Sequence, residues 1–264
     1  MTDYGVELLA FAPHPDDAEL FCGGLLCKLA GQGYRTAVVD VTNGEKASRG
    51  TPETRALETA AASRVMGLSV RENLALPDTW VNPWAGYEAK ESERIAASAV
   101  MRVAEVIRRL RPEIVVAPWE RDRHPDHEAA SQLITRALML ASVRNVVTDP
   151  ASTPFMPRQV MYYPMRQLTE PTVIVDVTEA HARKMSAVQC YASQVAQRAA
   201  EPPTLVGSPL ALPALEARDR FYGSQIGVAY AEPYILRNAV GLGDPVDHFR
   251  RNTFSQPLFF PERQ

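Results

Sequence analysis

FAPHPDDAE, residues 11–19, carries the most informative pattern in this chain. Residues 6–11 form a short apolar run between Gly5 and Pro13, which is typical of a buried strand. After the stretch, small and apolar residues recur at helical spacing as far as Gly31. One imidazole and two adjacent carboxylates therefore stand on a strand-to-helix turn. In open α/β sheets such a turn, at the carboxyl end of a strand, is where ligands bind.

His14, Asp16 and Asp17 are the residue types of a catalytic metal centre. A zinc-type divalent ion takes imidazole nitrogen and carboxylate oxygen, and a catalytic site leaves one position for water. Because two successive carboxylates on a tight turn point in different directions, one can bind the ion while the other acts as general base. The turn alone also has a plainer interpretation, since an Asp at a helix start is often only a cap.

A second copy of this pattern lies far along the chain. Residues 114–117 form another buried-strand pattern, His124-Pro125-Asp126-His127 follows, and a helical run begins at Ala129. If the two strands are parallel neighbours, both turns open on the same edge of the sheet and can share one ion. Three of the five histidines lie in these two turns, which favours a metal site over two unrelated helix caps.

Strands and helices alternate through the first half of the chain. This alternation predicts an α/β fold, a Rossmann-like and mostly parallel sheet with helices on both faces and the metal site at the carboxyl ends of the strands. We expect one domain, 1–264, with a core of about 1–150 and a remainder, 151–264, that completes the site and makes subunit contacts. The expected strands are 34–41, 73–76, 160–163, 172–177 and 227–235, and the expected helices are 55–66, 88–110, 178–191 and 215–222. A proline-rich loop is expected at 201–213 and an apolar tail from residue 250 onward.

Composition gives no sign of a nucleic-acid or membrane partner. Lys plus Arg is 28 against 31 for Asp plus Glu, a net charge of -3. No apolar run approaches the ~18 residues of a membrane span, and no signal-peptide pattern stands at the N-terminus. We therefore expect a cytoplasmic protein, in which Cys22 and Cys27 are packing residues. Gly23-Gly24 lacks the Gly-Lys-Ser/Thr of a phosphate loop and is expected to allow close helix packing.

The two His-Pro-Asp motifs together resemble those of the PIG-L/LmbE-like zinc deacetylases, which remove acetyl groups from N-acetylglucosamine units. The resemblance covers nearly the whole chain and includes residues 42–45, 76–78, 189–194 and 230–232. These later pieces look most like the bacillithiol-pathway branch, whose substrate is N-acetylglucosaminyl-malate. Pro13 is a departure, since the family more often has Ala there. We expect it to stiffen the turn without removing a ligand.

The resemblance implies that His14, Asp17 and His127 are the protein ligands of Zn²⁺, with water completing the site. Asp16 would be the general base that takes a proton from this water as it attacks the acetamide carbonyl. Other divalent first-row metals are compatible with His/Asp ligands.

His124 and Asp126 have implied roles away from the metal. In the family the first histidine stabilises the oxyanion or protonates the leaving amine, and Asp126 would hydrogen-bond His124 and hold it in its charged form. Two alternatives stay open. His124 could be a fourth ligand that makes the zinc structural, and Asp126 could be a plain helix cap.

Three further residues are candidates for substrate binding. Arg55 matches a family arginine that contacts the sugar or its acidic aglycone, and Arg123 beside the second motif is another. Asp78 is a candidate sugar contact. Each has a plainer alternative, a surface salt bridge for the arginines and an ordinary turn for Asp78.

The resemblance implies hydrolysis of the N-acetyl group of a small amino-sugar conjugate, with N-acetylglucosaminyl-malate as the leading substrate. The alternatives are another N-acetyl amino sugar such as diacetylchitobiose or, in another class, a non-catalytic sugar- or nucleotide-binding module. The bacillithiol branch also suggests a homo-oligomer, a hexamer.

Overall fold

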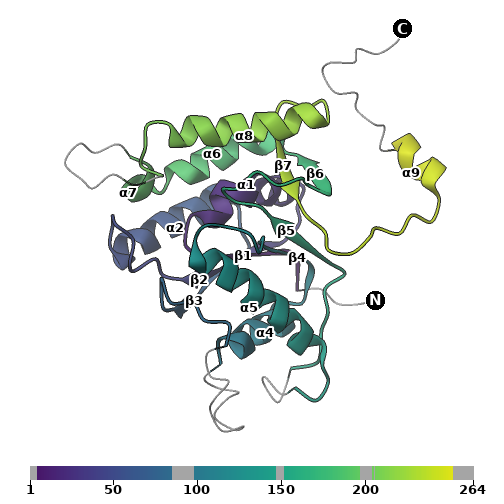
Figure 1. The fold of residues 1–264 in the computed structure, drawn as a ribbon, viewed down its shortest axis with the longest axis horizontal. Coiled ribbons are helices and arrows are strands. Elements are labelled where there is room, and N and C mark those ends of the chain that lie inside the picture. Colours follow the sequence, from purple (N-terminus) through teal and green to yellow (C-terminus); the bar gives the residue numbers. More distant parts are fainter. Residues whose placement is uncertain (1–4, 85–97, 147–151, 197–203, 205, 252–264) are drawn as a thin grey trace.

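A five-stranded parallel sheet forms the centre of the molecule (Figure 1). The strand order is β3-β2-β1-β4-β5, so the direction in which strands are added reverses between β1 and β4. In doubly wound folds this switch point is where ligands bind, outside the carboxyl ends of the strands. The strands are β1 (Val6–Ala12), β2 (Thr36–Thr42), β3 (Val70–Leu76), β4 (Pro112–Pro118) and β5 (Gln159–Tyr163). The computed structural model describes residues 5–84, 98–146, 152–196, 204 and 206–251.

β1 and β4 are the two strands on which the site depends. Both are buried along most of their length, as expected for parallel strands covered on two faces. They pair in parallel, with Leu9 beside Val115 and Ala10 beside Val116. The turns that follow the two strands therefore leave the sheet at the same edge.

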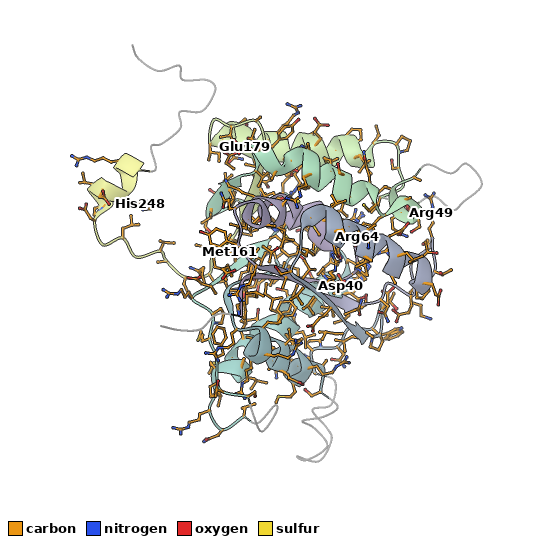
Figure 2. All side chains as sticks on the ribbon, turned by 180° about the vertical axis from the view of Figure 1, so that it is seen from behind. Asp40, Arg49, Arg64, Met161, Glu179 and His248 are labelled. Atoms are coloured by element: carbon orange, nitrogen blue, oxygen red, sulfur yellow. The ribbon has the colours of Figure 1, made fainter. Side chains whose placement is uncertain are left out.

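Helices cover both faces of the sheet, and side chains fill the space between the layers (Figure 2). In Figure 1, α4 and α5 lie on one face, while α1, α2, α6 and α8 lie on the other. Among the described residues, no helix is long and apolar enough to cross a membrane. The helices are α1 (Asp17–Gly31), α2 (Pro52–Met66), α4 (Ala99–Leu110), α5 (Pro125–Ser142), α6 (His181–Gln189), α7 (Ala192–Val195), α8 (Ala211–Gln225) and α9 (Pro245–Arg251), with a 3-10 turn, η1, at Thr178–Ala180.

A small antiparallel sheet of β6 (Val173–Asp176) and β7 (Ala231–Tyr234) lies beside the main sheet. Ile235, just after β7, forms an isolated bridge with Tyr162 of β5. This bridge ties β7 to the edge of the main sheet. Figure 2 shows His248 on α9, apart from both sheets.

α1 packs closely against the later part of the chain. A Cβ atom on Gly24 would lie 2.8 Å from Val177 Cβ and 2.9 Å from Glu232 Oε1, and one on Gly23 would lie 3.2 Å from Lys184 Cγ. The prediction that these glycines allow close packing is confirmed. Cys22 and Cys27 are likewise buried on this helix.

The α/β prediction is confirmed, and the differences lie at element ends. α2 begins at Pro52 rather than residue 55, because the Thr51 hydroxyl accepts a hydrogen bond from the Thr54 amide and caps the helix. α8 begins at Ala211, inside the expected loop, because Pro213 is tolerated in a first turn, where backbone amides need no helical partner. The expected helix 178–191 is divided into η1 and α6. Residues 88–97, most of 201–205 and the tail from 252 lie outside the described residues.

Candidate metal centre

The turn between β1 and α1 places His14 beside Asp17 and directs Asp16 elsewhere. The His14 amide donates to Asp17 Oδ2 at 3.0 Å, and His14 Nδ1 lies 3.1 Å from the same oxygen. Asp16 has a φ of 113°, which is rare for a residue with a side chain, and its Oδ1 lies 3.5 Å from Arg55 Nη2. Asp16 makes no side-chain hydrogen bond to the start of α1. Asp16 therefore occupies the N-cap position of α1, but its carboxylate does not cap the helix.

The turn between β4 and α5 brings the second motif to the same place. His124 is the N-cap of α5, and its Nδ1 accepts a hydrogen bond from the Asp126 amide at 3.3 Å. His127, in the first helical turn, has its Nε2 3.4 Å from Asp17 Oδ2. The two distant turns therefore meet at the switch point of the sheet, as the two strand patterns predict.

His14, Asp17 and His127 form a group that fits a divalent metal. Each offers one ligand atom, and these atoms all lie within 4.8 Å of one another. Two imidazole nitrogens and one carboxylate oxygen match the three protein ligands of catalytic zinc sites. His14 also belongs to a second possible group, with His124 and Asp126, so the described geometry leaves open the alternative in which His124 is a ligand.

Asp122 is a site residue that the sequence analysis missed. Its Oδ1 lies 3.1 Å from His127 Nδ1 and accepts a hydrogen bond from the His124 amide at 2.9 Å. A carboxylate behind a metal-binding histidine fixes the ring and leaves the other nitrogen for the ion. The available signal was an acidic residue in the polar stretch just before the second motif.

Asp126 is not hydrogen-bonded to the His124 ring through its carboxylate. Its oxygens accept from the amides of Thr79 at 2.7 Å and Val81 at 3.2 Å, and Oδ2 also lies 3.2 Å from His14 Nε2. The expectation that Asp126 holds His124 in its charged form is therefore wrong, because backbone amides from the loop after β3 take up the carboxylate. These contacts go outside α5, so the plain-cap alternative is wrong too.

The three candidate substrate contacts differ in exposure. Asp78 is buried, with Oδ1 3.3 Å from His14 Nε2 and Oδ2 accepting from the Lys46 amide at 2.8 Å. Arg55 is also buried, and its guanidinium donates to the Pro15 carbonyl beside Asp16. Arg123 is exposed. Asp78 and Arg55 thus brace the first turn, and Arg123 has the freedom that a substrate contact needs.

The carboxylates around His14 and His127 favour a positive charge at this site. Burial lowers the pKa of His14, but contacts with Asp126, Asp17 and Asp78 outweigh it and raise the pKa well above its usual value. Burial also lowers the pKa of His127, but the carboxylates of Asp17 and Asp122 outweigh this effect and raise the pKa to about 9. Without a metal, these carboxylates would keep protons on the two imidazoles. A divalent ion supplies the same positive charge, so the donor set fits one.

The two residues next to the ligands have pKa values suited to proton transfer. Burial, together with the Asp17 charge, raises the pKa of Asp16 to about 7, although Arg55 acts in the opposite direction. Burial and the neighbouring imidazoles of His127 and His14 lower the pKa of His124. In the metal-free protein, Asp16 therefore titrates near neutral pH, and these neighbours favour the neutral form of His124.

The fold and the site define a protein that can hold a metal at the switch point of a Rossmann-like sheet. The sequence profile of the family described as PIG-L, GlcNAc-PI de-N-acetylase, matches residues 9–138. This segment contains both turns and every residue of the metal centre.

Similar proteins agree with this match. A diacetylchitobiose deacetylase from Thermococcus kodakarensis is 26% identical over 239 residues, covering 86% of this chain and 81% of that protein. A 1D-myo-inositol 2-acetamido-2-deoxy-alpha-D-glucopyranoside deacetylase from Actinosynnema mirum is 28% identical over 229 residues, covering 72% of this chain and 81% of that one. The crystal structure of a conserved protein from Thermus thermophilus is 36% identical, with a TM-score of 0.77 over 90% of this chain and 97% of that chain.

The chain carries the PIG-L family domain at residues 9–138, and it is an enzyme of that family, which acts on amides. Membership excludes the non-catalytic binding module that the sequence left as an alternative. The Actinosynnema relative, by its name, acts on an acetylated glucosamine joined to inositol, so the group attached to the sugar differs among relatives.

Proposed function

We propose that this protein uses Zn²⁺ to hydrolyse the N-acetyl group of N-acetylglucosaminyl-malate, the deacetylation step of bacillithiol biosynthesis. The observation that carries the proposal is the meeting of the two turns, with Asp17 among the ligand atoms and the adjacent Asp16 turned away from them. The choice of malate is supported by the resemblance of residues 189–194 and 230–232 to the bacillithiol branch.

Asp16 is suited to activate the attacking water. A divalent ion bound by His14, Asp17 and His127 would polarise the acetamide carbonyl and lower the pKa of a nearby water. Asp16 accepts the proton of that water as the water attacks the carbonyl carbon. It then returns a proton to the leaving nitrogen when the C–N bond breaks, which gives acetate and a free amine. A bound cation beside Asp16 would favour its ionised form, which is the form that accepts a proton.

His124 is suited to stabilise the oxyanion. Because its Nδ1 accepts the Asp126 amide, the neutral ring carries its proton on Nε2. The ring is stacked on His127, with centroids 4.6 Å apart, and lies 4.9 Å from the His14 ring. A preorganised N–H donor at this distance from the ligands can bind the carbonyl oxygen as negative charge develops on it.

The test is acetate release from N-acetylglucosaminyl-malate and from diacetylchitobiose, with and without a chelator. We expect chelator-sensitive hydrolysis of both, with the higher kcat/KM for the malate conjugate. A higher kcat/KM for diacetylchitobiose would show that the malate conjugate is not the preferred substrate. Acetate release that a strong chelator leaves unchanged would contradict the metal-dependent mechanism.

A further inference from the structure

A large cavity lies beside the metal centre and has no part in the mechanism above. Its volume is about 610 Å³, within the range of roughly 300–1,000 Å³ that is usual for small-molecule sites. Its walls come from four parts of the chain, namely the second turn of α1, the turn before α5, the segment after β5, and the start of α8 with the segment that leads into it.

The cavity adjoins the metal centre through residues of both turns. Leu20 in its wall lies three residues after Asp17 on α1, and Arg123 directly precedes His124. The amide of Arg166, a further wall residue, donates to Asp122 Oδ2 at 3.4 Å, and Asp122 faces His127. A substrate with its acetamide at the metal centre therefore has this cavity within reach of its other end.

The walls combine an apolar surface with arginines. Arg218 is committed to the fold, since it donates to the Pro164 carbonyl at 2.6 Å and lies 3.3 Å from Asp219. Arg123 and Arg166 are exposed, and among the described residues no carboxylate pairs with either side chain. The larger apolar wall residues include Leu20, Phe21, Met165, Leu168, Leu212 and Leu215.

We infer that this cavity receives the group joined to the sugar, and that it takes hydroxy acids with an apolar side chain. The carboxylate pairs with Arg123 and Arg166, which can bind it bidentately. The hydrocarbon part lies against the leucines and Phe21. The inference rests on the proposed deacetylation and extends its substrate class, because a compact diacid such as malate satisfies the arginines but leaves the apolar wall uncovered.

The test compares four β-linked N-acetylglucosamine conjugates, carrying malate, phenyllactate, 2-phenylethanol and methanol. We expect the phenyllactate conjugate to have the lowest KM, about tenfold or more below that of the methyl glycoside, with the other two in between. Arg123→Gln and Arg166→Gln should each reduce the KM advantage of phenyllactate over phenylethanol. Arg121→Gln is the matched control, because Arg121 is exposed nearby and is not among the residues that line the cavity.

Leu168→Asp gives a second, independent variant. Leu168 is 74% exposed, so the change should leave folding intact while placing a carboxylate in the wall. We expect the KM for the phenyllactate conjugate to rise more than that for the methyl glycoside. Equal KM values for all four conjugates, unaffected by these substitutions, would overturn the inference and leave the deacetylase intact. If wild-type protein loaded with zinc releases no acetate from any conjugate, the proposed function itself fails.

Discussion

Two buried clusters of charge can be compared in this molecule, the metal centre and a second cluster where α1, α6, α8 and β7 meet. In the second cluster the fully buried Lys184 has its Nζ 2.6 Å from Asp219 Oδ2 and 2.9 Å from Glu232 Oε1. Glu232 also accepts from the amides of Gly24 and Leu25, both at 2.8 Å. The chain thus supplies its own cation here and surrounds it with partners.

The metal centre has no such permanent cation among its ligands. His14 and His127 face the carboxylates of Asp17, Asp78, Asp122 and Asp126 and can be positive only by holding a proton. A lysine that carries its charge permanently neutralises the surrounding carboxylates by itself. The imidazoles of His14 and His127 can instead release their protons and bind a metal ion. Substitutions should therefore affect stability in one cluster, and metal binding or catalysis in the other.

The largest expected effect is that of Asp16→Asn on turnover. Losing the general base should lower kcat by about 10²- to 10⁴-fold, while bound metal and the melting temperature stay close to wild type. Asp17→Asn is the matched variant, and it should lose metal as well as activity. Acetate release, elemental analysis and thermal melting check both. Normal turnover by the Asp16 variant would show that another group is the base.

Lys184→Met should be the most destabilising of these changes. It leaves Asp219 and Glu232 buried without their cation, and breaking such a pair costs about 3–5 kcal/mol. Urea unfolding measures the change. Lys46→Met, at an exposed lysine, is the control and should stay within about 0.5 kcal/mol of wild type. A loss below about 1 kcal/mol for Lys184→Met would mean that the cluster contributes little.

The metal-free protein should lose stability as pH rises. The pKa of His127 is raised to about 9, so its protonated form contributes stability below about pH 6.5 that disappears as pH passes through about 9. Asp16, raised to about 7, acts in the same direction over a lower range. We expect His127 alone to account for a loss of about 3 kcal/mol. Melting of the chelated protein between pH 6 and 9 tests it.

Excess zinc should reverse this trend, since metal competes with protons for the same nitrogens and binds more tightly as pH rises. Identical pH profiles with and without metal would contradict the assignment of His127 as a ligand.

Asp122→Asn should have the smallest effect. It weakens the support of the His127 ring, and loss of such a partner typically lowers metal affinity or activity by about 10- to 100-fold. Competition with a chromophoric chelator measures the affinity. Unfolding of the metal-free protein should change far less than for Lys184→Met, and an unchanged zinc affinity would show that Asp122 does not position the ligand.

The metal-ligand group was predictable from sequence because it is built from two copies of the same short motif. Each His-Pro-Asp motif follows a buried-strand pattern, and parallel neighbours bring the ends of both strands to one edge of the sheet. The partners of Asp126 were not predictable in this way. They are backbone amides of the loop after β3. Ala75 near the end of β3 and Thr79 in this loop adopt positive φ, and neither residue type signals that conformation.

The Lys184 cluster was missed for a different reason. A lysine in a helix is normally exposed, and its partners, Asp219 and Glu232, stand on elements much further along the chain. Only the packing of α6 between α1 and α8 shows that its side chain is buried. The Gly23-Gly24 pair did predict close packing of the helix, but nothing in the sequence indicated that Glu232 is the carboxylate that it packs against.

The contact between Glu232 and the middle of α1 bears on how the protein is made. The helix that begins with Asp17 obtains this carboxylate partner only from a strand near the end of the chain. During synthesis, the amides of Gly24 and Leu25 must wait until more than two hundred further residues have left the ribosome. The helix that leads away from the metal centre is therefore encoded early but obtains these buried contacts only late in synthesis.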